Sequence, residues 1–131
     1  MYPPHRTIAA WTLVGLYAAG IFALSSLSQP PLVSSWELPH LDKLCHSLAY
    51  GGLTLLLMRA LRLAYPTCPS MTLCAWGLVL VVSYGALDEL HQAFTPGRMM
   101  SLLDLFADAA GASMVASMWP IMERRWPTLL R

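Results

Sequence analysis

Four long apolar stretches, separated by short polar segments that are rich in proline, make up most of the chain. They predict helices over residues 8–27, 42–64, 71–92 and 102–122, each long enough to cross the roughly 30 Å hydrocarbon core of a bilayer. Of the ten prolines, only Pro120 lies within a predicted helix, close to its end. Because backbone groups in lipid need internal hydrogen bonds and the connections are short, this pattern predicts an all-α, polytopic bundle of four antiparallel transmembrane helices.

The composition supports an integral membrane protein and limits the chain to one domain, residues 1–131. Hydrophobic residues make up 56% and charged residues 11%, against about 45–50% and about 25% in typical soluble domains. The first apolar run is longer than the core of a usual signal peptide, so we expect a retained anchor in the cell (inner) membrane. A net charge of +1 without a basic block argues against nucleic-acid binding, and three cysteines without a CxxC pair argue against a disulfide framework.

The basic residues predict the orientation of the bundle. With a cytoplasmic N-terminus, only Lys43 and Arg98 lie on the outer side. The other basic residues are then cytoplasmic: Arg6, Arg59, Arg62, Arg124, Arg125 and Arg131. The positive-inside rule therefore favours N-in and C-in termini. Six of the seven acidic residues fall on the outer side, namely Glu37, Asp42, Asp88, Glu89, Asp104 and Asp108, and the inner interface would be marked by Trp11, Trp76 and Trp119.

Two rows of small residues at helical spacing predict close helix contacts. Gly15, Ala19 and Ala23 form one row on the first helix, and Asp108, Ala112 and Ala116 form another on the fourth. Small side chains let membrane helices approach closely, where no hydrophobic driving force exists between them. Ordinary membrane-helix composition explains either row equally well.

Polar side chains recur at helical spacing at three helix ends that this topology brings together. Each ionisable group costs roughly 2.5–3.5 kcal/mol at the centre of a membrane helix, so such groups indicate partners, water or a function. The stripes are Asp42, His46 and Tyr50 on the second helix, Tyr84, Asp88 and Gln92 with Glu89 on the third, and Asp104, Asp108 and Gly111 on the fourth. We expect them to meet in one cavity that opens to the outer side.

Each polar residue also has a simpler explanation. Asp42 can cap its helix beside a solvated Lys43, and Ser101 with Asp104 fits the capping box S-x-x-D. His46 can bond to another helix, and Tyr50 can pack with its hydroxyl anchored. The remaining simple explanations are a solvated His91 and an Arg98 paired with Glu89 or Asp104. Together these do not account for Asp88, Glu89 and Asp108.

The polar residues follow two motifs. The second helix reads D-K-x-x-H-x-x-x-Y over residues 42–50, and residues 88–104 read D-E-x-x-Q-x-F-x-P-G-R-x-x-S-x-x-D, with Gly111 seven residues later. Over nearly its whole length the chain resembles the VanZ-like family of membrane proteins. It differs from that family at Asp108, where Asn is usual, and at Ser47, where an aromatic residue often follows the histidine. The family is named for a protein linked to antibiotic resistance, specifically to reduced glycopeptide (teicoplanin) susceptibility. The resemblance therefore implies a cell-envelope context more strongly than a resistance role for this chain, and it names no reaction.

These features favour a site that acts on or binds an amphiphilic, anionic headgroup or a cell-wall-related ligand. The other expected partners are the membrane lipids. His46 with Asp42 or Asp88 would form an acid–base pair, and Lys43 and Arg98 would clamp phosphate or carboxylate. The candidate catalytic residues are Asp42, His46, Asp88, Glu89 and Asp104. The candidate ligand-binding residues are Lys43, Tyr50, Gln92, Arg98, Ser101 and Asp108.

The sequence leaves enzymatic activity and oligomeric state open. No nucleophile motif, P-loop or phosphatase signature is evident, and we expect no cofactor or metal; a metal variant would use His46, Asp88, Glu89 and Asp104. The main alternative is an accessory or binding membrane protein whose polar cluster is structural. A small transporter is less favoured because the cluster lies near one surface, whereas transporters usually hold their site near the midplane.

Overall fold

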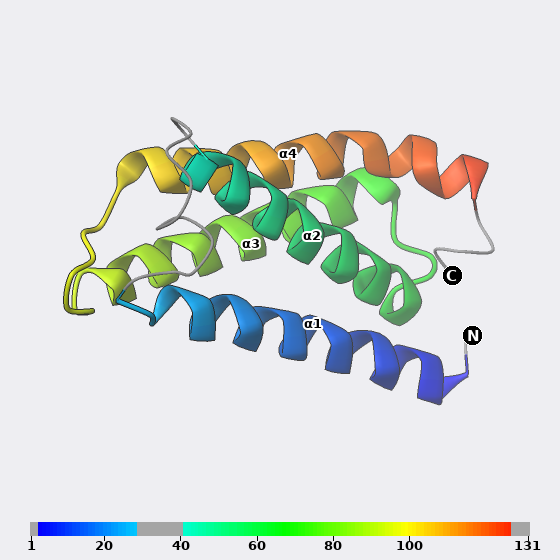
Figure 1. Cartoon of the computed structure of the whole chain (residues 1–131). Coiled ribbons are helices and arrows are strands. Elements are labelled where there is room, and N and C mark those ends of the chain that lie inside the picture. Colours follow the sequence, from blue (N-terminus) through cyan, green and yellow to red (C-terminus); the bar gives the residue numbers. More distant parts are fainter. Residues whose placement is uncertain (1–2, 29–40, 127–131) are drawn as a thin grey trace.

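The computed structural model describes residues 3–28 and 41–126, and the regular elements in those ranges are four helices. They are α1 (Pro4–Ser25), α2 (Leu41–Ala64), α3 (Ser70–Gln92) and α4 (Leu102–Arg125), shown in Figure 1. All four predicted helices are present, and each is long and apolar enough to cross a membrane. The largest boundary differences are an earlier start of α1 and a longer α4. Glu37 and Arg131, which entered the predicted orientation, lie outside the described residues.

The helices form an antiparallel bundle in which α2 is the central contact element. In Figure 1, α1 and α4 lie on opposite sides, and α2 slants from α4 at its start toward α1 at its end. The contact between α2 and α4 is the most extensive of the helix pairs. The starts of α2 and α4 and the ends of α1 and α3 share one end of the bundle, here called the Asp42 end; the opposite end is called the Arg62 end.

The tight contact between α2 and α4 depends on glycine. A Cβ atom at Gly111 would collide with the backbone carbonyl of Ser47, and its distance to the Ser47 carbonyl carbon would be only 2.7 Å. At Gly51 an added Cβ would lie 3.4 Å from the Gly111 carbonyl oxygen. The two backbones therefore touch close to His46 and Asp108, and this contact sets the spacing of the helices that carry those side chains.

Of the two small-residue rows, only the row on α4 lies at a contact. Asp108, Ala112 and Ala116 are buried against the other helices, as expected. The expected contact through Gly15, Ala19 and Ala23 is wrong within the described chain, because these residues are exposed. The packed face of α1 is instead the one that carries Ala10, Val14, Ala18, Ile21 and Ser25. Spacing alone did not distinguish these faces, because both contain small residues.

Pro120 lies inside α4, which continues through it to Arg125. Proline has no N–H, so the carbonyl of Ala116 four residues earlier loses its usual helical donor. The thiol of Cys74 in α3 donates to that oxygen at 3.3 Å. The neighbouring helix thus supplies the missing hydrogen bond, and α4 extends beyond residue 122, where the sequence predicts its end.

Trp119 does not mark a membrane interface, because its side chain is fully buried in the core of the bundle. It packs in the main cluster with Leu57, Leu61 and Leu73. Trp11 and Trp76, the other two tryptophans of the predicted belt, are exposed near the starts of α1 and α3. Position along the helix suggested an interface, but the face of α4 on which Trp119 lies is turned inward.

Candidate functional site

The predicted site residues lie at the Asp42 end of the bundle, in three connected groups. The first is centred on His46 in α2. Its Nδ1 lies 2.9 Å from Asp108 Oδ1 in α4, and its ring stacks on that of Tyr50 one turn along, with 6.4 Å between centroids. The sequence suggested Asp42 or Asp88 as the partner of His46; the structure identifies Asp108 instead.

The space for this pair comes from a glycine on the third helix. A Cβ atom at Gly85 in α3 would lie 3.0 Å from Asp108 Oδ2 and 3.2 Å from the Tyr50 ring. The missing side chain at Gly85 therefore lets Asp108 and Tyr50 reach the centre of the bundle, where both are almost completely buried.

Three oxygen atoms around His46 have no hydrogen-bond partner among the described residues. They are the hydroxyl of Tyr50, Oε1 of Glu89 and Oδ2 of Asp108, and all three are buried. A buried carboxylate oxygen without a donor is costly, because it has lost its water without replacement. These atoms mark the part of the site that the described residues leave without hydrogen-bond partners.

The second group forms the N-terminal cap of α4. Ser101 Oγ accepts from the Asp104 backbone N–H at 3.2 Å, which confirms the predicted capping interaction. In the usual capping box the third residue of the helix would bond back to the Ser101 N–H. Here Glu89 Oε2 of α3 accepts that hydrogen at 2.7 Å. The carboxylate of Asp104 is therefore free to bind Lys43.

Lys43 bridges two carboxylates at the partly exposed edge of this group, here called the rim. Its Nζ lies 2.5 Å from Asp104 Oδ1 and 2.6 Å from Asp42 Oδ2. The Asp42 side chain is 41% exposed, whereas that of Asp104 is 13% exposed. The bridge to Asp104 therefore joins α2 to α4. Because Asp42 is more exposed, it is the partner of Lys43 that another anion could replace more easily.

The third group is a chain of hydrogen bonds that fixes α1 and the turn before α4 to α3. Ser25 Oγ donates to Asp88 Oδ1 at 2.5 Å, and Gln92 Nε2 donates to Asp88 Oδ2 at 3.2 Å. Arg98 Nη2 then donates to Gln92 Oε1 at 2.8 Å. Both Asp88 oxygens are thus partnered, and Arg98 pairs with Gln92 rather than with Glu89 or Asp104. Sequence reasoning missed Ser25, which carries only the weak signal of a serine at the end of α1.

Two further contacts hold α1 at this end. Tyr84 Oη donates to the Ala18 carbonyl at 2.7 Å. His91, expected to be solvated, lies 3.1 Å from Ser26 Oγ and packs its ring against Phe22 at 4.5 Å between centroids. These contacts are the polar attachment of a helix that is otherwise largely exposed.

Comparison with known proteins identifies the family. The VanZ/LLP1 family model matches residues 6–123, which include every residue of the three groups and all four helices except the first two residues of α1 and the last two of α4. The chain belongs to the VanZ/LLP1 family. No curated protein and no solved structure matches it. It is therefore a VanZ/LLP1 family multi-pass membrane protein, whose site must be interpreted from its own geometry.

Among the described residues of this VanZ/LLP1 family protein, one set of side chains around His46 could hold a metal ion. His46, Glu89 and Asp108 each offer one ligand atom, and these atoms all lie within 4.8 Å of one another. The set differs from the sequence-derived variant, which contained Asp88 and Asp104. Both of those carboxylates are engaged elsewhere, Asp88 by Ser25 and Gln92 and Asp104 by Lys43.

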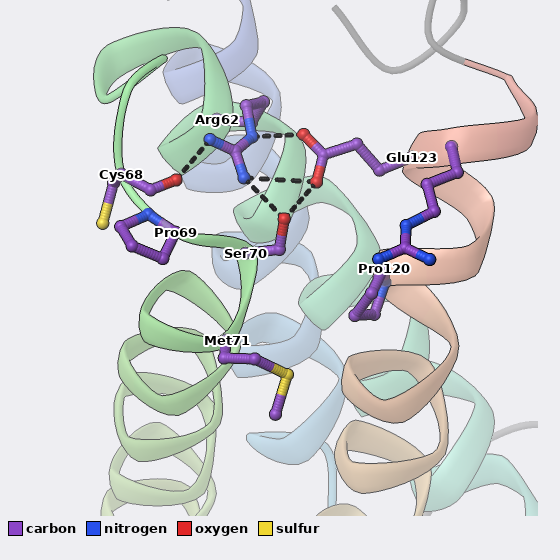
Figure 2. Close-up of a pocket in the computed structure, with 8 residues that line it drawn as sticks. Arg62, Cys68, Pro69, Ser70, Met71, Pro120 and Glu123 are labelled. Atoms are coloured by element: carbon purple, nitrogen blue, oxygen red, sulfur yellow. Dashed lines mark hydrogen bonds and ion pairs between the residues drawn. The ribbon is translucent and has the colours of Figure 1, made fainter.

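A second polar cluster, which the sequence analysis did not find, lies at the Arg62 end. Figure 2 shows the buried Arg62 guanidinium between Glu123 and the α2–α3 turn. Arg62 forms an ion pair with Glu123, donates to the Cys68 carbonyl at 2.7 Å, and donates to Ser70 Oγ at 3.0 Å. The cluster borders a pocket of about 650 Å³ that also contains Met71 and Pro120. Through these contacts the cluster joins α2, α3 and α4.

Proposed function

We propose that this VanZ/LLP1 family protein acts on or binds the headgroup of an amphiphilic, cell-wall-related ligand at the outer face of the cell membrane. The observation that carries the proposal is the His46–Asp108 contact of 2.9 Å beside the unpartnered oxygens of Glu89 and Tyr50. A histidine held by a carboxylate is a suitable general base or acid, because the partner fixes the ring and its tautomer. With Nδ1–H donated to ionised Asp108, Nε2 is the nitrogen left for proton transfer.

The anionic part of the headgroup would bind at the rim. Lys43 is the accessible cation there, with a side chain 26% exposed, and it is already shared by Asp42 and Asp104. Binding an anion therefore requires exchange of one carboxylate for the ligand. Asp42, the more exposed partner, is the one that exchanges in this proposal. Arg98 is bound to Gln92 and contributes at longer range.

The orientation in this proposal has both termini in the cytoplasm and the Asp42 end outside. It is supported by the distribution of basic residues along the sequence. The test is labelling of intact cells with a membrane-impermeant maleimide, in a background with Cys45, Cys68 and Cys74 replaced by serine. Met99→Cys, in the exposed turn before α4, should be labelled, and Thr67→Cys, in the exposed turn before α3, should not. The reverse pattern would contradict the orientation.

The ligand proposal is tested by identifying amphiphiles that co-purify with the full chain, using mass spectrometry after mild detergent extraction. We expect one class of anionic or cell-wall-related amphiphile to be enriched with the wild type and lost from Lys43→Gln. In cells, His46→Gln should reproduce the change in teicoplanin susceptibility caused by deleting the chain. His5→Gln is the matched control, because His5 is exposed at the opposite end of the bundle. Wild-type behaviour of His46→Gln, at normal membrane levels, would contradict a functional site at this position.

The alternative, an accessory membrane protein with a structural cluster, is favoured by one observation. The Ser25–Asp88–Gln92–Arg98 chain satisfies its members and connects α1, α3 and the turn before α4. Under this alternative, changes at His46 would lower thermal stability in proportion to any loss of function. Under the catalytic or binding proposal, function is lost while the melting temperature in detergent stays close to that of the wild type.

A further inference from the structure

Two buried carboxylates lie beside His46: Asp108 of the first group and Glu89, which also caps α4 in the second group. One oxygen of each is hydrogen-bonded. Asp108 is 1% exposed and Glu89 is 2% exposed. Asp108 Oδ1 contacts His46 Nδ1, and Glu89 Oε2 accepts from the Ser101 backbone N–H. Asp108 Oδ2 and Glu89 Oε1 have no partner among the described residues. The Ser101 N–H orients Glu89 from outside the cluster, as outer hydrogen bonds do for ligands in metal sites. The His46–Asp108 contact joins two members of the cluster, so a cation bound between them would replace that hydrogen bond at Nδ1.

The free groups converge on one point from three helices. Ligand atoms of His46 in α2, Glu89 in α3 and Asp108 in α4 all lie within 4.8 Å of one another. Ligands around a tetrahedral zinc ion are about 3.3–3.6 Å apart, given metal–ligand bonds of about 2.0–2.2 Å. An approach of about 1 Å closes the difference.

The kinds of ligand identify the class of ion. One imidazole and two carboxylates suit zinc or manganese, whereas magnesium and calcium prefer oxygen ligands alone. Two negative carboxylates also balance the charge of a divalent cation in a site of low dielectric, where unpaired charges are costly. We propose that His46, Glu89 and Asp108 bind one divalent cation of the zinc or manganese class.

This inference deepens the proposed function and rests on it for its biological meaning. The first group and the rim together contain more acidic than basic side chains, and Lys43 is already paired with two of the carboxylates. A divalent cation would give the centre of the site the positive charge that an anionic headgroup requires. It would also connect α2, α3 and α4, so binding should stabilise the bundle.

The test is titration of the metal-stripped full chain in detergent with zinc, manganese, magnesium or calcium, followed by calorimetry and elemental analysis. We expect one zinc or manganese ion per chain and a rise in melting temperature on binding. Glu89→Gln and Asp108→Asn should each weaken binding by at least about tenfold. Both variants keep an oxygen acceptor for the Ser101 or His46 contact, and therefore should fold. His5→Gln, which removes an exposed imidazole at the opposite end of the bundle, should bind as the wild type does.

Two outcomes would overturn the inference. One is the absence of saturable zinc or manganese binding to the wild type up to about 1 mM, the weak limit of specific affinity. The other is binding that Glu89→Gln and Asp108→Asn leave unchanged. Since the titration uses no headgroup ligand, a negative result would leave the proposed function standing. Conversely, metal binding together with wild-type cellular behaviour of His46→Gln would remove the proposed function and leave the metal site.

Discussion

The backbone N–H of Ser101 donates to Glu89 Oε2 at 2.7 Å, so a carboxylate of α3 completes the N-terminal cap of α4. The other oxygen of the same carboxylate is buried next to His46 and Asp108 and has no partner in the described part of the chain. One side chain therefore has a structural contact and a free ligand atom. Substitutions at Glu89 can separate these two roles, because the cap needs an acceptor, whereas charge-dependent chemistry needs the carboxylate.

Glu89→Ala should lower the stability of the bundle more than Glu89→Gln. Loss of a helix cap costs about 1 kcal/mol, and glutamine keeps an oxygen that can accept from Ser101. Thermal unfolding in detergent, followed by circular dichroism, measures the difference. Equal stability of the two variants would mean that the Ser101 N–H obtains its partner elsewhere.

Gly111→Ala should destabilise the protein by about 1–3 kcal/mol, because the new Cβ collides with the Ser47 carbonyl and forces α2 away from α4. Gly15→Ala is the matched control. Nothing lies within 4 Å of a Cβ atom at position 15, so this change should be neutral or stabilising by up to about 1 kcal/mol. The same unfolding assay applies, and equal effects at both positions would contradict the backbone contact.

Arg62→Met should cost about 3–5 kcal/mol, because it leaves the buried Glu123 carboxylate without its cation. Adding Glu123→Leu should recover part of that loss, since the double variant has no unpaired buried charge. Melting temperatures of the wild type, both single variants and the double variant form a double-mutant cycle. An additive double variant would show that the Arg62–Glu123 pair contributes no coupling energy.

Cys74→Ala should cost about 1 kcal/mol, because the Ala116 carbonyl loses its donor. In a Pro120→Ala background the same change should cost less, since the backbone N–H at position 120 can then bond to Ala116. Cys74→Ser keeps a donor and is the control. If Cys74→Ala lowers stability as much in the Pro120→Ala background as in the wild type, the Cys74 thiol does not compensate for the proline.

The sequence predicted the four helices and the gathering of polar residues at one end, because both follow from hydropathy and helical spacing. Spacing locates a residue on a helix face, and Asp42, His46 and Tyr50 indeed lie along α2. It does not determine the rotation of one helix against another. The partner of His46 was therefore assigned to Asp42 or Asp88, and the inward direction of Trp119 was missed.

Contacts between distant segments were the least predictable part of the site. Ser25 and Asp88 are 63 residues apart, and Arg62 and Glu123 are 61 apart. Arg62 was interpreted only as a positive charge near the cytoplasm. Its burial and pairing depend on how the ends of α2 and α4 approach, which no local pattern encodes. The catalytic and ligand-binding roles assigned to residues at the Asp42 end stay predictions.

The glycine contact between α2 and α4 has a mechanical consequence for access to His46. Two helices whose main chains already touch make a stiff pair that resists separation near the site. The first helix is different: apart from its apolar face, it is attached to this end of α3 through the side chains of Ser25, Tyr84 and His91. Separating α1 from α3 at this end therefore requires the loss of a few side-chain contacts, whereas separating α2 from α4 requires two touching main chains to move.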